Sequence, residues 1–287
     1  MSALLTEARR GFHRQLVEDR TLMLDEAGIA SNADGSQRTS REIAAFIARG
    51  LGARQGPKKL PGQQAGRQFE VAVQSFLEQT FPLMQSLRPG KWHVENVGGQ
   101  RGEYHLARYE PYSHLDELAR AIEKSPTLIS VLGNSYEISP DVLITREPET
   151  DEVINRQLEL VDRFSARHAV IRRANQDRAI VHAVVSCKWT LRSDRAQNAR
   201  SEALNLIRNR KGRTPHIAVV TGEPSPSRLA SLALGTGDLD VIYHFALPEL
   251  IDGVEATGND EGISMLGHLV DGKRLRDIAD LPLDLAV

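Results

Sequence analysis

Apolar residues recur at helical spacing through the first part of the chain, with polar stretches between them. The spacing predicts helices over residues 3–18, 40–53, 67–86, 113–124 and 126–132. Polar loops are expected at 30–39 and 56–66, and a strand at 91–97. Within 67–86 the apolar positions include Phe69, Val73 and Phe76, and Pro82 predicts a kink near the end.

The second half alternates between short β-branched runs and helical patterns. Strands are expected at 136–146, 178–189, 216–221 and 239–244. Helices are expected at 153–168, 194–209, 225–234 and 248–254. Because such alternation is typical of a central mixed β-sheet covered on both faces by helices, we expect an α/β fold. No hinge composition divides the chain, so we expect one domain over 1–287, with 1–60 as a helical N-terminal elaboration.

Composition places the chain among ordinary globular proteins, since 40% of its residues are hydrophobic and 26% are charged. The longest mostly apolar run, 179–187, is far too short to span a bilayer, and the N-terminal stretch lacks the apolar core of a secretory signal. A single cysteine, Cys187, excludes an internal disulfide, and no Cys/His set has zinc spacing. We therefore expect a cytoplasmic protein with no membrane partner.

The charge distribution says more than the net charge of −2, which by itself argues against a nucleic-acid partner. Residues 186–213 carry eight Lys or Arg against only Asp194 and Glu202. Such a local excess can meet phosphates while the remainder keeps the protein soluble. A solvated basic helix face explains the same charges equally well at this point.

Candidate chemistry begins on the expected strand 178–189, where Ser186 and Lys188 point to one face and Cys187 to the other. A lysine in an apolar strand is costly to bury without a carboxylate or phosphate nearby. Asp141, which follows Pro140 in the expected strand 136–146, is a candidate partner. A simple buried ion pair between Asp141 and Lys188 remains an alternative.

A second acid, Glu202, lies on the expected helix that follows Lys188 directly. Ser193 and Asp194 are competent N-cap residues for that helix. We therefore expect Asp141, Lys188 and Glu202 to surround one small volume. Two carboxylates at such a distance repel unless a hard cation such as Mg²⁺ lies between them, and Mg²⁺ with a lysine suits phosphodiester hydrolysis. On spacing alone, Glu70 is a surface glutamate of the helix 67–86.

Base recognition is suggested by Arg192, Asp194 and Arg195, at the start of the same helix. Arginine can bind guanine through two hydrogen bonds and aspartate can accept from cytosine, so the trio suits G·C pairs in a major groove. Exposed ion pairs around an N-cap are the alternative. Arg228 begins another expected helix and can reach DNA from a similar position. The loops with Ser36 and Gln63 are polar enough to contact a minor groove.

At this point the chain resembles a known family. Pro140-Asp141, then Ser186-Cys187-Lys188, then Glu202 resemble the permuted active site of the CCGG-cutting type II restriction endonucleases. In the general PD-(D/E)xK nuclease pattern an acid stands two residues before the lysine, whereas this chain has Ser186 there and Glu202 on the helix. Five segments resemble the NgoMIV-like members specifically, and the similarity covers almost the whole chain: SCKWTLRSDRAQNARSEALNLIRNRKGR, SNADGSQ, LPGQ, TPHIAVVTGEPSPSR and DLPLDLAV.

The resemblance implies a restriction-endonuclease-like fold and Mg²⁺-dependent cleavage of double-stranded DNA within GCCGGC, leaving four-base 5′ overhangs. It implies a homotetramer made of two dimers, and we expect an accompanying DNA methyltransferase that protects the host genome. Rival interpretations are a structure-specific or repair nuclease of the same fold and a non-catalytic DNA-binding protein.

The resemblance also implies residue roles. Asp141 and the Cys187 carbonyl would hold metal, Glu202 would act through a second metal or its waters, and Lys188 would be the catalytic lysine, with Ser186 in the active-site motif. Glu70 acquires a catalytic-site role that its spacing did not suggest. Matching residues imply that Arg192, Asp194 and Arg195 read the central CCGG, and that Arg228, Gln63 and Ser36 contact the outer base pair.

Overall fold

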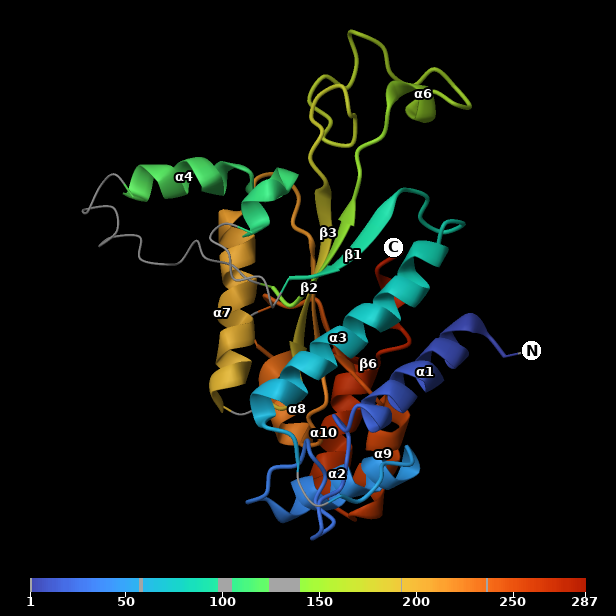
Figure 1. Cartoon of the computed structure of the whole chain (residues 1–287), viewed down its shortest axis with the longest axis vertical. Helices are drawn as coiled ribbons and strands as arrows, with labels where there is room; N and C mark the ends of the chain where they lie inside the picture. The colour runs from blue at the N-terminus through green and yellow to red at the C-terminus, as the bar shows by residue number, and fades with distance from the viewer. Residues whose placement is uncertain (1, 57–58, 98–104, 124–139, 192, 236) are drawn as a thin grey trace.

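The structure, a computed structural model, describes residues 2–56, 59–97, 105–123, 140–191, 193–235 and 237–287, and for residues 105, 119, 122–123 and 193–196 it describes the backbone alone. In this part of the chain, six strands form one sheet in sequence order (Figure 1). The strands are β1 (Trp92–Asn96), β2 (Val142–Arg146), β3 (Ile180–Lys188), β4 (His216–Thr221), β5 (Val241–His244) and β6 (Leu275–Asp277). The first three strands are antiparallel and β3 to β6 are parallel, so the predicted mixed sheet is confirmed.

Helices cover both faces of this sheet. On one face lie α7 (Ser193–Asn209), η2 (His105–Arg108), η3 (Glu110–Tyr112) and α4 (His114–Glu123). On the other lie α1 (Leu4–Glu18), α2 (Arg38–Gly50), α3 (Gly62–Thr80), η1 (Phe81–Leu83), α8 (Pro226–Ala233), α9 (Leu247–Ala256) and α10 (Asp260–Asp271). Alternation along β3 divides its side chains between two cores: Val184 faces α7, and Val185 faces α3. The predicted α/β architecture is therefore confirmed.

The N-terminal helices share the main core with the sheet. Phe12 and Ile43 are buried in the same apolar cluster as Phe69 and Leu250. No helix in the described part of the chain is long and apolar enough to cross a membrane. The organisation as one domain with an elaboration over 1–60 stays a prediction.

Two predictions about elements were wrong. Helix α3 begins at Gly62, so the expected loop 56–66 ends early and Gln63 lies in the first helical turn. The helix expected at 153–168 is reduced to α6 (Asp151–Ile154). Beyond it, the Asn155 side chain accepts hydrogen bonds from the backbone N–H groups of Leu160 and Val161, and such local bonds compete with a helix.

Three elements near the C-terminus were not anticipated: α10, β6 and α11 (Leu281–Asp284). The four-residue α11 and the three-residue β6 are too short to leave a periodic signal. The expected helix 126–132 lies outside the described residues. So does the beginning of the expected strand 136–146, of which β2 is the described end.

Residues 147–179, which we call the arm, connect β2 to β3 and project from the end of the sheet opposite to α2 (Figure 1). The two limbs of the arm hold each other: Glu149 N–H donates to Ile171 O at 2.7 Å, and Arg173 N–H donates to Glu149 O at 2.8 Å. Arg172 forms a two-pronged ion pair with Asp151, at 2.6 and 2.7 Å.

Candidate active site

The site lies where the end of β3 meets the beginning of β2. The antiparallel register pairs Val142 with Val185, so Asp141, one residue before β2, comes next to the last residues of β3. Oδ2 of Asp141 accepts a hydrogen bond from the Cys187 backbone N–H at 2.6 Å and one from Lys188 Nζ at 3.2 Å. The side chains of Asp141 and Lys188 are each 14% exposed, so the pair is largely shielded but still open to solvent.

Helix α7 brings the second acid to the same place. Ala203 and Leu206 pack against the sheet and hold the helix over the face that carries Ser186 and Lys188. Oε2 of Glu202 accepts from Ser186 Oγ at 3.2 Å and lies 3.5 Å from Lys188 Nζ. The predicted convergence of Asp141, Lys188 and Glu202 is confirmed as geometry.

The pKa values of the groups in the site are shifted by burial and by the nearby carboxylates. Burial alone lowers the pKa of Lys188, but Asp141 and Glu202 outweigh it and the net pKa is raised, so this ammonium stays protonated. Burial raises the pKa of Glu202, the positive charge of Lys188 lowers it, and Asp141 raises it again. Burial also raises the pKa of the Cys187 thiol, which points to the opposite face from Lys188.

Glu70 belongs to this electrostatic neighbourhood, although it comes from α3 on the other side of the sheet. Burial and the charge of Asp141 raise the pKa of Glu70 to about 7, while Lys188 lowers it. The apolar pattern of α3 predicted an ordinary surface glutamate, and only the family resemblance pointed to the site. Burial is the larger cause of the raised pKa and the Asp141 carboxylate adds to it, so Glu70 experiences the charges of the site.

The donor chemistry of the site suits a hard divalent cation, because carboxylate and carbonyl oxygens are the ligands that such ions prefer. Asp141 and Glu202 face one volume, and Glu70 adds an acid whose ionisation is suppressed. Among the described residues, no three His, Cys, Asp or Glu side chains stand close enough to form a metal site by themselves. In this arrangement Lys188 Nζ lies between the two acids.

A second group of predicted residues meets around Asp34, in the loop that precedes α2. Ser36 donates to Asp34 Oδ1 through both its backbone N–H, at 2.9 Å, and its hydroxyl, at 2.7 Å. Arg228, in the first turn of α8, donates to Asp34 Oδ2, and its Nη1 lies 3.7 Å from Glu223 Oε2. Ser36 and Arg228, 192 positions apart in sequence, are thus brought to one carboxylate. Gln63 is exposed at the start of α3.

The side chains of the other residues predicted to read bases, which we call base readers, cannot be located relative to the site. Arg192 lies outside the described residues, and the side chains of Asp194 and Arg195 do too, although their backbone forms the first turn of α7. Sequence reasoning missed Asp34 and Glu223. Asp34 had a usable signal, because Asp two residues before Ser36 in a polar loop is typical of a side chain that bonds its own backbone.

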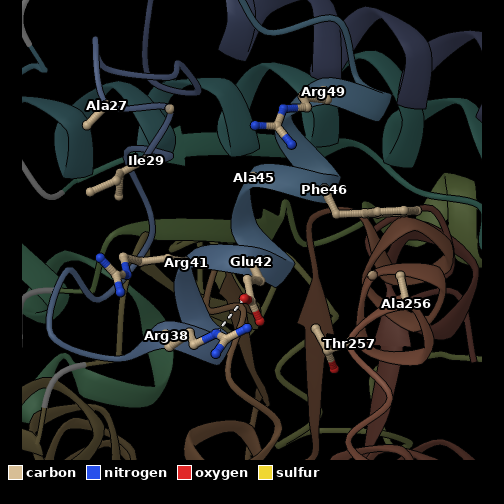
Figure 2. A pocket seen from close by; sticks show the side chains of 12 residues that line it. Ala27, Ile29, Arg38, Arg41, Glu42, Ala45, Phe46, Arg49, Ala256 and Thr257 are labelled. Atoms are coloured by element: carbon tan, nitrogen blue, oxygen red, sulfur yellow. Dashed lines mark hydrogen bonds and ion pairs between the residues drawn. The ribbon is translucent and has the colours of Figure 1, made fainter.

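A pocket of about 630 Å³ lies between α2 and the end of α9, away from these acids (Figure 2). Arg38, Arg41 and Arg49 line it with Phe46, and Arg38 is already paired with Glu42 at 2.8 Å. None of the acids around Lys188 lines this pocket. The candidate chemistry is therefore at the strand ends and not in this pocket.

Comparisons with known proteins identify the family of the chain. The chain matches the family model described as NgoMIV restriction enzyme over residues 12–287. It is 48% identical to the type II restriction enzyme NgoMIV of Neisseria gonorrhoeae, over 100% of both chains. Among solved structures it resembles the restriction endonuclease PspGI–substrate DNA complex, with 13% identity, 99% coverage of this chain, 92% of that chain and a TM-score of 0.25, which is too low to carry an argument. The chain therefore belongs to the NgoMIV restriction enzyme family and is a type II restriction endonuclease.

Proposed function

We propose that Asp141, Lys188 and Glu202 form the centre at which this enzyme hydrolyses DNA phosphodiester bonds with Mg²⁺. The observation that carries the proposal is the contact of one lysine ammonium with two acids from separate elements, 3.2 Å from Asp141 and 3.5 Å from Glu202. Glu202 lies in the middle of α7, and the first turn of the same helix, which follows Lys188 closely in sequence, bears the residues proposed to read bases.

Each residue has a distinct task in this proposal. The Asp141 carboxylate and the Cys187 carbonyl would hold the cation, with Glu202 and Glu70 completing the acidic surroundings. When bound, Mg²⁺ would polarise the scissile phosphodiester and lower the pKa of a bound water. Lys188, kept protonated by its acidic neighbours, stabilises negative charge on the reacting phosphate. Ser186 orients Glu202 through its 3.2 Å hydrogen bond.

We propose GCCGGC as the recognition sequence, cut to leave four-base 5′ overhangs, on the strength of the family resemblance. Arg192, Asp194 and Arg195 would read the central CCGG. Assigning Ser36 and Arg228 jointly to the outer base pair is supported by their common contact with Asp34. Gln63 would approach the same base pair from the start of α3.

The proposed assembly is a homotetramer of two dimers, and the arm supports it. Leu158, Leu160 and Phe164 are 67%, 61% and 71% exposed on the arm. Large apolar side chains gathered on a projecting segment are typical of an interface that becomes buried in an assembly. Because the proposed substrate is double-stranded DNA, we also propose that the enzyme acts in the cytoplasm, together with a methyltransferase that modifies the same sequence.

The test is a digest of plasmid DNA with the purified chain and Mg²⁺, followed by run-off sequencing of the ends. We expect discrete fragments, cut within GCCGGC, and none when EDTA replaces Mg²⁺. Fragments with other defined ends would contradict the recognition sequence but keep the reaction. Cleavage only at junctions or damaged sites would favour a structure-specific nuclease. Sequence-specific binding without cutting would favour a non-catalytic DNA-binding protein.

A further inference from the structure

The last residue of β4 and the two residues after it, 221–223, form a short turn that is bonded to the backbone of the proposed catalytic lysine. Thr221 Oγ1 donates to the Lys188 carbonyl oxygen at 2.7 Å, and the Gly222 N–H donates to the same oxygen at 3.2 Å. Thr221 has no exposed surface. Two buried hydrogen bonds to one carbonyl fix the end of β3 more firmly than strand pairing alone.

The same turn carries a buried acid that bonds to two other segments. Glu223 is 0% exposed; its Oε2 accepts from the Leu191 N–H at 2.8 Å and its Oε1 from the Ser225 N–H at 3.1 Å. Leu191 comes immediately before Arg192 and the first turn of α7. Ser225 comes immediately before α8, which carries Arg228. One carboxylate therefore bonds to the residues that precede α7 and α8, two helices that bear residues proposed to read bases.

Close packing keeps the turn from moving independently. A Cβ added at Gly222 would lie 2.5 Å from Cε3 of Trp189, so only glycine fits there. The Gly222 carbonyl accepts from Asn32 Nδ2 at 2.7 Å, and buried Asn32 anchors the loop of Asp34 and Ser36. The turn is thus joined to a third segment with a proposed reader.

We infer that Glu223 is a positioning residue that holds the base-reading segments in register with Lys188, so that recognition of the correct sequence is coupled to cleavage. Glu223 contacts neither DNA nor the reacting phosphate in this role. It acts through the N–H groups of Leu191 and Ser225 and through Arg228. The inference rests on the proposed function, because it needs a DNA sequence to be read.

The chemistry of the carboxylate explains why glutamate is needed. Both oxygens accept from backbone donors, and Oε2 also faces Arg228. In Glu223→Gln one of these oxygens becomes an NH₂ donor, so either the Leu191 or the Ser225 N–H loses its acceptor in a buried place. One unsatisfied N–H group should lower the population of the correctly arranged site, and with it the rate of cleavage, by about 5- to 100-fold.

The experiment measures cleavage of one duplex with the preferred site and of duplexes that differ from it by one base pair. The variants are Glu223→Gln and Asp277→Asn. Asp277 is a matched control, because it is also buried, accepts the N–H groups of Leu247 and Ala279, and pairs with Arg9, but it lies on β6, three strands away from β3. Both variants are expected to lower the melting temperature.

We expect Glu223→Gln to reduce kcat/KM on the preferred site by about 10- to 100-fold and to reduce the preference over altered sites by a similar factor. Asp277→Asn should leave that preference unchanged. If Glu223→Gln lowers only the melting temperature, as the control does, Glu223 is structural and the inference is wrong. Where Glu223→Gln gives no folded protein, Glu223→Asp replaces it, because its side chain is one methylene shorter and draws the carboxylate away from the Leu191 and Ser225 N–H groups. A preserved preference in Glu223→Asp overturns the inference equally.

The outcome for the wild-type chain separates this inference from the proposed function. If the wild-type chain cuts no defined sequence, both the proposed function and the coupling role of Glu223 are wrong. A wild-type chain that cuts one sequence, with unaltered preference in the Glu223 variants, removes only the coupling role.

Discussion

The catalytic end of the sheet and the arm use polar groups in opposite ways. At the strand ends, bonds join residues far apart in sequence, as when Asp141 accepts from Cys187 or Glu223 from Leu191. At the tip of the arm, residues 155–165, side chains bond to residues close in sequence, as Asp162 does with Phe164 and Ser165. The two regions also differ in the exposure of their apolar side chains, which are buried beside the site and largely exposed on the arm.

The two bonding patterns constrain the two regions to different extents. Long-range bonds to buried acceptors hold the catalytic groups rigidly, because each bond constrains two elements at once. The base of the arm is attached to the body, since Glu147 pairs with Lys91 and Arg178 donates to the Ala107 carbonyl. Local bonds shape its tip, where the exposed apolar side chains stay available to another subunit. Substitutions at the two places should therefore affect different measurements.

The largest effect is expected for Asp141→Ala. Cleavage should fall by at least about a thousandfold, because the carboxylate proposed to hold the metal is removed. Sequence-specific binding without metal should remain within a few-fold of the wild type in a gel-shift assay. The Cys187 N–H loses its acceptor, which costs about 1–3 kcal/mol of stability.

Exposed Asp252→Ala on α9 is the control for Asp141→Ala, and it should change neither quantity. Loss of folding in Asp141→Ala would instead identify Asp141 and Lys188 as a structural ion pair. Undiminished cleavage would remove the catalytic role from this end of the sheet.

The second prediction concerns Glu70, whose pKa is raised to about 7 by burial and by Asp141. Below about pH 4.5 the acid is protonated in both states. As the pH rises from there to 7, the unfolded chain ionises first, so the free energy of unfolding falls. Glu70→Gln should remove this decline and make the metal-free protein more stable at pH 8.

Urea unfolding in EDTA across pH 4 to 8 measures the effect of Glu70→Gln. The exposed Glu78, on the same helix, provides the control Glu78→Gln, which should retain the decline. Parallel pH curves for wild type and Glu70→Gln would mean that Glu70 does not experience the charge of the site.

Sequence patterns predicted the skeleton of the catalytic end well. Strand β3 was clear because its nine residues are largely β-branched or small and apolar, and Lys188 stood out as the one charge in that run. Glu202 followed from its place on the next helix. Glu70 and Glu223 could not be found in this way, because their importance depends on which strand ends the fold brings beside them, and periodicity carries no such information.

The arm shows the complementary failure. Residues 153–168 contain enough apolar and charged positions to suggest a helix, but Asn155 and Asp162 bond to the nearby backbone instead. Without a core to bury Leu158 and Phe164, helical periodicity gains nothing from packing. The apolar pattern predicts that these side chains pack on the core of their own chain, whereas the structure leaves them exposed on the arm.

The third prediction tests that partner. Leu158→Ser with Leu160→Ser should shift a tetramer toward dimers in sedimentation velocity, because each buried leucine contributes about 1.5–3 kcal/mol to an interface. Leu83→Ser with Leu87→Ser is a matched control, since these leucines are 61% and 60% exposed outside the arm. Equal shifts for the two pairs would show that association does not depend on the arm. An unchanged tetramer in the first pair would place the interface elsewhere.

The smallest effect, and the sharpest test of the comparison, is expected for Asn155→Ala. Its Oδ1 accepts from Leu160 and Val161 N–H groups, each at 2.9 Å, and these bonds close a loop inside the arm. Losing them should destabilise the arm by about 1–2 kcal/mol and speed amide hydrogen exchange there.

Asn259→Ala, which removes the N-cap of α10, is the control and should speed exchange only in α10. Exchange in β3 and cleavage of DNA should not change in either variant, because no long-range bond joins Asn155 to the strand ends among the described contacts. Faster exchange at Cys187 or Lys188 in Asn155→Ala would mean that the arm and the catalytic end move as one unit, and that local bonding does not isolate them.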